Sequence, residues 1–460
     1  MLKYHPMSSQ TVSSSHLKPL TYSVDSKQEI SIGSLKLKDL VKQFGSPLYI
    51  LCEETIRERA RQYTQAFKDF YEADTLVVYA SKALNTRAIC KIIDQEGLGL
   101  DVVSGGELYT ALSVNFPKER IIFHGNNKSY EELEMAIENE IGSIMLDNFH
   151  ELNLISTILE ANEALRSKKI SFTIRLTPGI ECHTHEYIKT GRIDSKFGFN
   201  LNEVDKVIKT IQELQSKYEN VSVKGLHAHI GSQIFETEPH KDVPNVLLQE
   251  LKKIQDIHNI KLQDLNVGGG LGIKYMESDD PPEIRDWVKI ICDSVKANCE
   301  KLDLELPRIL VEPGRSLLGP AGLTVYEVGN IKDIPGVRKY VAVDGGMADN
   351  VRPIMYQAEY EATVDSKVNS TDTEKVTIAG KYCESGDILI KDIELPKIES
   401  KDLIVIFSTG AYNYSMASNY NRVTKPAMIL VNKGKADIIV KRESLEDLIR
   451  LDEVPERLGA

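Results

Sequence analysis

Short apolar runs alternate with amphipathic stretches from about residue 75 to about residue 312. Each run is followed by a polar or glycine-containing loop and then by a stretch with helical periodicity, such as EELEMAIENE. Strands that alternate with helices in this way predict parallel β-α-β units. The apolar runs are, in order, TLVVYA, LGLDVVS, IIFHG, SIMLDN, SFTIRL, KGLHAHIG, LNVGGG and ILVEPG. Eight such units over roughly 250 residues predict a (β/α)8 barrel of the TIM type.

The pattern changes after about Ser316. KYVAVDGG, EKVTIAGKY, DLIVIFSTGAY and AMILVNKGKADIIV are β-rich runs with turn residues and little helix between them. They predict a separate β-domain, built as a β-sandwich or β-barrel. The segment ISIGSLKLKDLVKQFGSPLYIL precedes the barrel, and we expect it to add a strand and a helix to the β-domain. The expected organisation is a tail and joining segment over residues 1–48, the barrel over 49–317 and the β-domain over 318–460.

Composition narrows the class of protein. A chain of 460 residues with 42% hydrophobic and 27% charged residues fits a globular protein of more than one domain. The formal net charge of -12 argues against nucleic acid or a membrane surface as a partner. The six cysteines form no C-x-x-C pair, which favours free thiols and a cytoplasmic location. The N-terminus lacks an apolar signal core, so we expect a frayed tail there.

Chemically capable side chains follow the C-terminal ends of the predicted barrel strands. In a (β/α)8 barrel all of these ends meet at one mouth, where enzymes of this fold place their active sites. We therefore expect these residues to lie together. They are Lys82, Asp101, Ser104, His124, Arg175, His229, Ser232, the glycines at 268–270 and Glu312.

Three of these positions have a specific chemical interpretation. Lys82 in YASKALN could bind a carbonyl cofactor covalently, although most loop lysines are merely solvated. The three glycines of NVGGGLG could bring backbone N–H groups close to a phosphate, or could simply form a tight turn. Glu312 and Arg315 in VEPGRS could bind a ring nitrogen and an anion, or could pair with each other.

The stretch GLHAHIGSQ contains His227 and His229, and we expect only one of the two to face the barrel interior. An inward histidine is most often part of a satisfied core, but at this level it could stack on a planar cofactor. We find no convincing metal-ligand spacing around these histidines, and we expect no metal site. A lysine, a glycine loop, a carboxylate and a histidine at one mouth match the needs of pyridoxal 5'-phosphate.

Taken together, the motifs resemble those of the fold-type III pyridoxal-phosphate-dependent decarboxylases. The matching stretches are YASKALN, DVVSGGEL, DSKFGF, HAHIGSQ, GGGLG, EPGRS, YCESGD and GAYNYSMASNYN. This resemblance implies a homodimer in which the CESGD loop of one chain reaches the barrel mouth of the other. Ser81, Leu84, Asn413 and Tyr414 depart from the usual pattern, and none of them has an implied role.

The resemblance also implies roles for individual residues. Lys82 would carry the cofactor, His229 would stack on its ring and Glu312 would contact its pyridine nitrogen. Cys383 would be the proton donor. The remaining residues implied in cofactor binding are Ser232, Gly269, Gly270, Pro313, Gly314, Arg315 and Tyr412, and those implied in substrate binding are Arg315, Arg352, Tyr356, Glu384 and Tyr412.

Two classes of substrate remain to be compared. Ornithine, lysine, arginine and carboxynorspermidine need only an acid such as Glu384 for the distal amine. Diaminopimelate also has a distal carboxylate, which needs a cation, and NVRPIMY offers Arg352 with Tyr356. We therefore expect decarboxylation of meso-2,6-diaminopimelate to lysine, the last step of lysine biosynthesis. A catalytically inactive regulatory homologue is disfavoured because Lys82 and Cys383 are both present, and a racemase is disfavoured because racemases of this fold lack the CESGD element.

Overall fold

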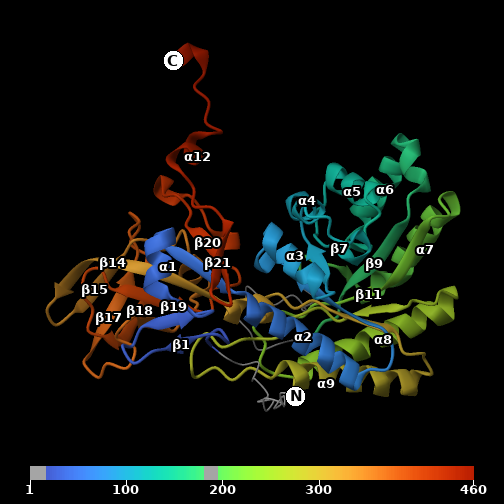
Figure 1. Cartoon of the computed structure of the whole chain (residues 1–460). Helices are drawn as coiled ribbons and strands as arrows, with labels where there is room; N and C mark the ends of the chain where they lie inside the picture. Colours follow the sequence, from blue (N-terminus) through green and yellow to red (C-terminus); the bar gives the residue numbers. More distant parts are fainter. Residues whose placement is uncertain (1–16, 181–194, 460) are drawn as a thin grey trace, which may run out of the picture.

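The computed structural model describes residues 17–180 and 195–459. The frayed tail expected before residue 17, Cys182 and the first residue of DSKFGF lie outside the described residues. Two bodies are visible, a barrel ringed by helices and a smaller domain of β-strands (Figure 1).

The barrel is built from strands that are all parallel to their neighbours in the ring. They are β5 (Thr75–Ala80), β6 (Gly99–Val102), β7 (Ile121–Phe123), β8 (Ser143–Leu146), β9 (Ile170–Thr177), β11 (Val221–His227), β12 (Asp264–Asn266) and β13 (Arg308–Val311). Pairing of β13 with β5 and of β8 with β9 closes the ring. These eight strands are the eight apolar runs of the sequence, so the barrel prediction is confirmed. A two-residue strand that we did not expect, β10 (Phe199–Asn200), is added to β9.

Helices cover the outside of the barrel (Figure 1). Their inner faces follow the helical period, as in α7, where Val204, Val207, Ile208, Ile211 and Leu214 are the buried residues. Side-chain caps fix several helix starts, such as the capping box of Ser129 and Glu132 before α5. The main barrel helices are α2 (Glu53–Phe70), α3 (Arg87–Gln95), α4 (Gly105–Leu112), α5 (Tyr130–Glu138), α6 (Phe149–Ala161), α7 (Val204–Lys217), α8 (Glu238–His258) and α9 (Ile284–Leu302).

The second domain is a mixed sheet with strand order β18-β17-β15-β14-β4-β20-β21, and β19 pairs with β14 and β16. Two separate apolar clusters pack around it. The strands are β4 (Leu48–Cys52), β14 (Gly322–Ile334), β15 (Arg338–Val343), β16 (Ala362–Val364), β17 (Thr373–Ala379), β18 (Ile388–Pro396), β19 (Leu403–Phe407), β20 (Ala427–Asn432) and β21 (Lys435–Val440). The prediction of a C-terminal β-domain is confirmed.

The N-terminal segment joins this domain, as expected. It forms β1 (Ser23–Val24), β2 (Ile30–Ile32), β3 (Leu35–Lys36) and α1 (Leu37–Phe44) before β4. Strand β4 pairs antiparallel with β14 and parallel with β20. Residues 49–52, which we assigned to the barrel, are therefore part of the second sheet, because the wholly apolar LYILC fits the interior of either body. We propose that the barrel segment begins at Glu53. The boundary after residue 317 stays a prediction.

Candidate active site

The C-terminal ends of the barrel strands surround a cavity of about 460 Å3. Ten of the predicted site residues line it: Lys82, His229, Ser232, Gly270, Glu312, Gly314, Arg315, Arg352, Tyr356 and Tyr412. Asp101, His124 and Arg175 line it as well. Ser104 instead caps α4, because its Oγ accepts a hydrogen bond from the Glu107 N–H at 3.2 Å. One mouth therefore collects residues from strands far apart in the sequence, as the parallel barrel requires.

Lys82 lies in a single helical turn, Ser81–Ala83, directly after β5. The second domain reaches this turn, since the Tyr412 N–H donates to the Ala83 carbonyl at 2.9 Å. Tyr412 has a φ of 61°, a left-handed conformation that is uncommon for a residue with a side chain. Strain of this kind persists where the surroundings over-determine the backbone. The tyrosine ring is thereby held at the cavity wall.

The glycine loop after β12 approaches its neighbours too closely for larger residues. A Cβ on Gly269 would lie 2.1 Å from the Glu312 carbonyl oxygen, and Gly270 has a φ of +118°. The Gly269 N–H donates to the His229 Nδ1 at 3.3 Å. Pro313 supports the opposite side, where its carbonyl accepts from the Ala80 N–H at 3.1 Å. Gly269 and Pro313 are thus behind the cavity lining, and they shape the loops that form it.

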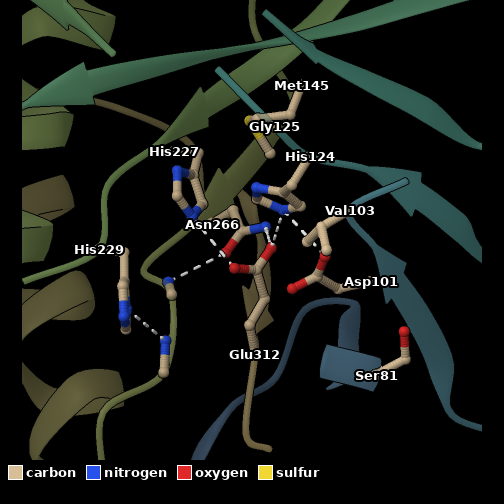
Figure 2. A network of polar contacts seen from close by, with 12 residues as sticks. Ser81, Asp101, Val103, His124, Gly125, Met145, His227, His229, Asn266 and Glu312 are labelled. Carbon is tan, nitrogen blue, oxygen red and sulfur yellow. Dashed lines mark hydrogen bonds and ion pairs between the residues drawn. The ribbon is translucent and has the colours of Figure 1, made fainter. Parts of the chain in front are cut away.

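Glu312 is the centre of a buried polar network (Figure 2). One carboxylate oxygen lies 2.8 Å from the His124 Nε2 and 2.6 Å from the Asn266 Nδ2. The other oxygen lies 3.1 Å from the His227 Nε2. Burial alone raises the pKa of Glu312, but the His124 and His227 rings outweigh it and bring the pKa well below its usual value. Glu312 is therefore an ionised, fixed acceptor at the bottom of the cavity.

His227, the last residue of β11, and His229, two residues further on, do not lie as expected. Both His227 and His229 line the cavity, so the expectation that only one faces the interior is wrong. Residues two positions apart on a strand share a face, and β11 ends at His227. Burial lowers the pKa of His227 to about 4 and that of His229 well below its usual value. Both rings are therefore neutral at pH 7.

Sequence reasoning gave no role to His227, His124 or Asn266 in orienting Glu312. The available signal was that each lies at or directly after the end of a barrel strand. His124, His227 and Glu312 also form a group whose ligand atoms lie within 4.8 Å of one another, close enough to hold a metal ion. Binding a metal would require giving up the hydrogen bonds that now hold the carboxylate.

Arg315 and Arg352 provide positive charge at the cavity wall, together with the buried Arg175. Arg315 donates from Nε and Nη2 to the Ser232 Oγ at 3.2 and 3.0 Å, and from Nη1 to the Tyr275 hydroxyl at 2.5 Å. Arg352 donates from Nε to the Tyr360 hydroxyl at 2.9 Å. Both side chains are buried, and no salt bridge links either of them to an acidic group within the described chain. Buried cations of this kind favour an anionic ligand.

Tyrosines complete the surroundings of these arginines. The Arg315 guanidinium lies 4.8 Å from the centre of the Tyr412 ring, and the Arg352 guanidinium lies 5.3 Å from that of Tyr356. Burial would raise the pKa of Tyr275, but the two arginines outweigh it and lower that pKa. The positive field of the site is thus strong enough to act on a neighbouring phenol.

Cys383 and Glu384 lie outside the lining of the cavity in their own chain. Both are exposed, and the Cys383 N–H donates to the Asn421 Oδ1 at 2.9 Å. Their neighbour Asp387 is buried and closes the loop, since its carboxylate accepts from the Met347 and Tyr382 N–H groups at 2.6 and 2.9 Å. The loop is therefore well anchored while its thiol faces outward. The roles inferred for Cys383 and Glu384 stay predictions.

His240 on α8 lies behind the glycine loop, where a Cβ on Gly270 would be 3.2 Å from its Cε1. Its ring packs edge-on against Trp287 at 5.3 Å, and burial lowers its pKa to about 4. A histidine that is neutral when folded and protonated when unfolded stabilises the protein above pH 6.5, and this stability is lost as pH falls toward 4.

His240→Leu is therefore expected to reduce the loss of stability between pH 7 and pH 4.5. The full effect of such a pKa change is about 3 kcal/mol at 1.36 kcal/mol per pKa unit. Scanning calorimetry of both proteins at the two pH values measures it, and comparison within each protein cancels the altered packing. An equal drop in melting temperature for both proteins would contradict the prediction.

Comparisons with known proteins identify the family. Residues 53–319 match the family model for the pyridoxal-binding domain of pyridoxal-dependent decarboxylases. The chain is 49% identical over 451 residues to a diaminopimelate decarboxylase from a Synechocystis species, covering 96% of this chain and 94% of that one. It is 47% identical over 423 residues to the diaminopimelate decarboxylase of Bacillus subtilis, covering 92% and 95%.

A solved structure gives the same result. The crystal structure of the M. jannaschii diaminopimelate decarboxylase in complex with L-lysine is 36% identical, with a TM-score of 0.86, and covers 95% of this chain and 99% of that one. The barrel, the lysine after β5 and the cavity define a pyridoxal-phosphate-dependent lyase of the barrel class. The chain belongs to the pyridoxal-dependent decarboxylases and, within them, to the diaminopimelate decarboxylase family.

The cavity fits this cofactor by its own chemistry. An ionised, fixed carboxylate is the group that a protonated pyridine nitrogen needs, and Glu312 is a carboxylate of this kind. A glycine loop with no room for side chains, next to Ser232 and Arg315, suits a phosphate. Lys82 lines the same cavity.

Proposed function

We propose that the protein decarboxylates meso-2,6-diaminopimelate to L-lysine and CO2, the last step of lysine biosynthesis. The observation that supports this choice is that Arg315 and Arg352 are buried at the cavity and have no salt bridge to an acidic group among the described residues. Arg315, beside Ser232, suits the cofactor phosphate and the substrate. Arg352 then has no anion unless the substrate brings a distal carboxylate, which diaminopimelate has and ornithine or lysine lacks.

The residues would divide the work as follows. Lys82 would hold the cofactor, and His229 would lie against the cofactor ring. When bound, pyridoxal phosphate supplies an electron sink for the carbanion that CO2 leaves behind. Glu312 would keep a proton on the ring nitrogen. Gly269, Gly270, Pro313, Gly314 and Tyr412 would shape the phosphate and ring site, while Tyr356 and Tyr412 would border the substrate.

We propose that the proton returned to the substrate comes from Cys383 of a second copy of the chain. In the same chain Cys383 and Glu384 are exposed and outside the cavity, on a loop that is otherwise anchored. Polar surroundings suit a thiol that acts at an interface between subunits. A homodimer with shared sites would bring Cys383 to the mouth as proton donor and Glu384 to the distal amine.

We also propose a cytoplasmic location. Every cysteine in the described parts of the chain is free, as expected in a reducing compartment. No helix of residues 17–180 and 195–459 is long and apolar enough to cross a membrane.

A panel of amino acids assayed for CO2 release with added cofactor tests the proposed activity. Diaminopimelate is expected to be the preferred substrate over lysine, ornithine and arginine. In the same preparation, borohydride reduction followed by peptide mass analysis is expected to place the cofactor on Lys82. A preference for ornithine or lysine, or label on another lysine, would refute the respective part of the proposal.

Arg352→Ala is expected to lose diaminopimelate decarboxylation while retaining cofactor. Removing one partner of a buried charge-assisted contact costs about 2–5 kcal/mol, because the other charge is left unpaired. In kcat/KM this corresponds to a loss of about 30-fold to several thousandfold. Steady-state kinetics and cofactor absorbance measure the two properties.

The matched control is Arg338→Ala. Arg338 pairs with Asp392 at 3.1 Å on the second sheet, outside the cavity lining. We expect this variant to keep wild-type kinetics. If Arg352→Ala also does so, the distal carboxylate is not bound by Arg352 and the substrate choice loses its main support.

A further inference from the structure

The last described residues, 441–459, form what we call the C-terminal arm. It rises away from the β-domain and ends clear of both bodies (Figure 1). Every residue from 449 to 459 is exposed. Large apolar side chains are among them and in the helix before them, each between 61% and 79% exposed: Leu445, Ile449, Leu451, Val454 and Leu458.

The arm contains a helix that needs a packing partner. Helix α12 (Leu445–Ile449) has five residues and a capping box formed by Ser444 and Asp447. Isolated helices shorter than about 12–15 residues are marginal in water, so most of their stability comes from packing an apolar face. None of the residues of α12 is buried against the rest of the described chain. The arm therefore lacks the surface that would order it.

The base of the arm is joined to the loop that carries Cys383. Arg422 donates from Nη1 to the Leu448 carbonyl and from Nη2 to the Asp452 Oδ2 at 2.6 Å. Its neighbour Asn421 accepts the hydrogen bond from the Cys383 N–H at 2.9 Å. Two consecutive residues thus connect the arm to the proposed catalytic loop. The arm is therefore linked by hydrogen bonds to the loop on which Cys383 is exposed.

The charge of the arm argues against a membrane as its partner. Residues 441–459 contain six acidic and four basic side chains. Amphipathic segments that bind anionic lipid surfaces instead carry an excess of Lys and Arg on the polar face. Mixed charges around exposed leucine and isoleucine are typical of a contact with another protein surface, with an apolar centre and a polar rim.

We propose that the C-terminal arm packs its apolar side chains on a second copy of this chain, beside the shared active site. This inference rests on the proposed homodimer, in which the Cys383 loop meets the partner, and the arm is joined to that loop through Asn421 and Arg422. The arm would bury Ile449, Leu451 and Val454 against the partner, and would hold the Cys383 loop in place through Asn421 and Arg422.

Sedimentation velocity over a concentration series tests this docking. A Leu451→Asp, Val454→Asp double variant is expected to weaken the dimer by about a hundredfold or more, since two side chains of this size lose their burial. The matched control is Val337→Asp, whose side chain is 72% exposed in the turn between β14 and β15. We expect the control to dimerise like the wild type.

Hydrogen exchange of the unaltered protein is a second measurement that needs no variant. The amides of residues 445–452 are expected to be protected in the dimer and to lose protection on dilution to monomer. The proposed docking would be overturned if the folded double variant dimerised with an affinity within about twofold of wild type, or if the arm were unprotected in the dimer. Neither result would contradict the proposed shared site. A wild-type protein that stays monomeric at all concentrations would overturn the proposed shared site together with the docking.

Discussion

A mixture of two inactive variants, Lys82→Ala and Cys383→Ala, is expected to recover about a quarter of wild-type activity once their subunits exchange. If each site uses Lys82 from one chain and Cys383 from the other, a mixed dimer has one site without either group and one intact site. Random pairing makes about half of the dimers mixed, and each has one working site of two. Decarboxylation assays of the separate and mixed proteins measure the recovery.

The alternative geometry gives a different result. If Lys82 and Cys383 act from the same chain, every site in every dimer lacks one group, and mixing restores nothing. Subunit exchange has to be verified with a tagged chain, because failure to exchange would imitate this outcome. Verified exchange without recovered activity would refute the shared site, although the assignment of Lys82 to the cofactor would stand.

Glu312→Gln is expected to lower kcat/KM by about 10²–10⁴-fold, within the range of a group that controls a proton in the reaction. The amide has nearly the same shape but cannot carry the negative charge that the His124 and His227 rings now stabilise. Cofactor should still bind, because Lys82 and the glycine loop remain. Kinetics and the absorbance spectrum of the bound cofactor measure both effects.

Glu312→Asp is the informative comparison for this variant. It keeps the charge but moves the carboxylate away from His124, His227 and Asn266. We expect Glu312→Asp to have a kcat/KM below that of the wild type and above that of Glu312→Gln. A Glu312→Gln variant within about tenfold of wild type would mean that the charge of Glu312 is not needed for the reaction.

The sequence predicted the barrel well because each of its strands is a separate apolar run that ends in polar or glycine residues. It located the cavity for the same reason, since parallel strands bring their C-terminal ends to one mouth. It did not predict that LYILC pairs with β14 and β20, because this stretch is apolar throughout. Periodicity cannot say which of two apolar interiors receives such a strand.

The partners of the site residues were harder to predict. Tyr275 and Tyr360 bind Arg315 and Arg352, but they lie in loops without a recognisable motif. Asn266 was visible inside NVGGGLG, yet only the folded chain shows its amide on Glu312. The position of Cys383 was inferred from a resemblance. A single chain places this residue outside the cavity, and we propose that a second copy brings it to the site.

Strand β4 also has a consequence for how the chain is made. It ends at Cys52, and its partners β14 and β20 begin at Gly322 and Ala427. At about 5–20 residues per second on the ribosome, roughly 15 to 50 s pass before the first of these partners is synthesised. The barrel strands are synthesised during this interval, β13 only shortly before β14, and the apolar strand β4 meanwhile has open edges. Chaperone binding near the N-terminus would protect the nascent chain during this interval.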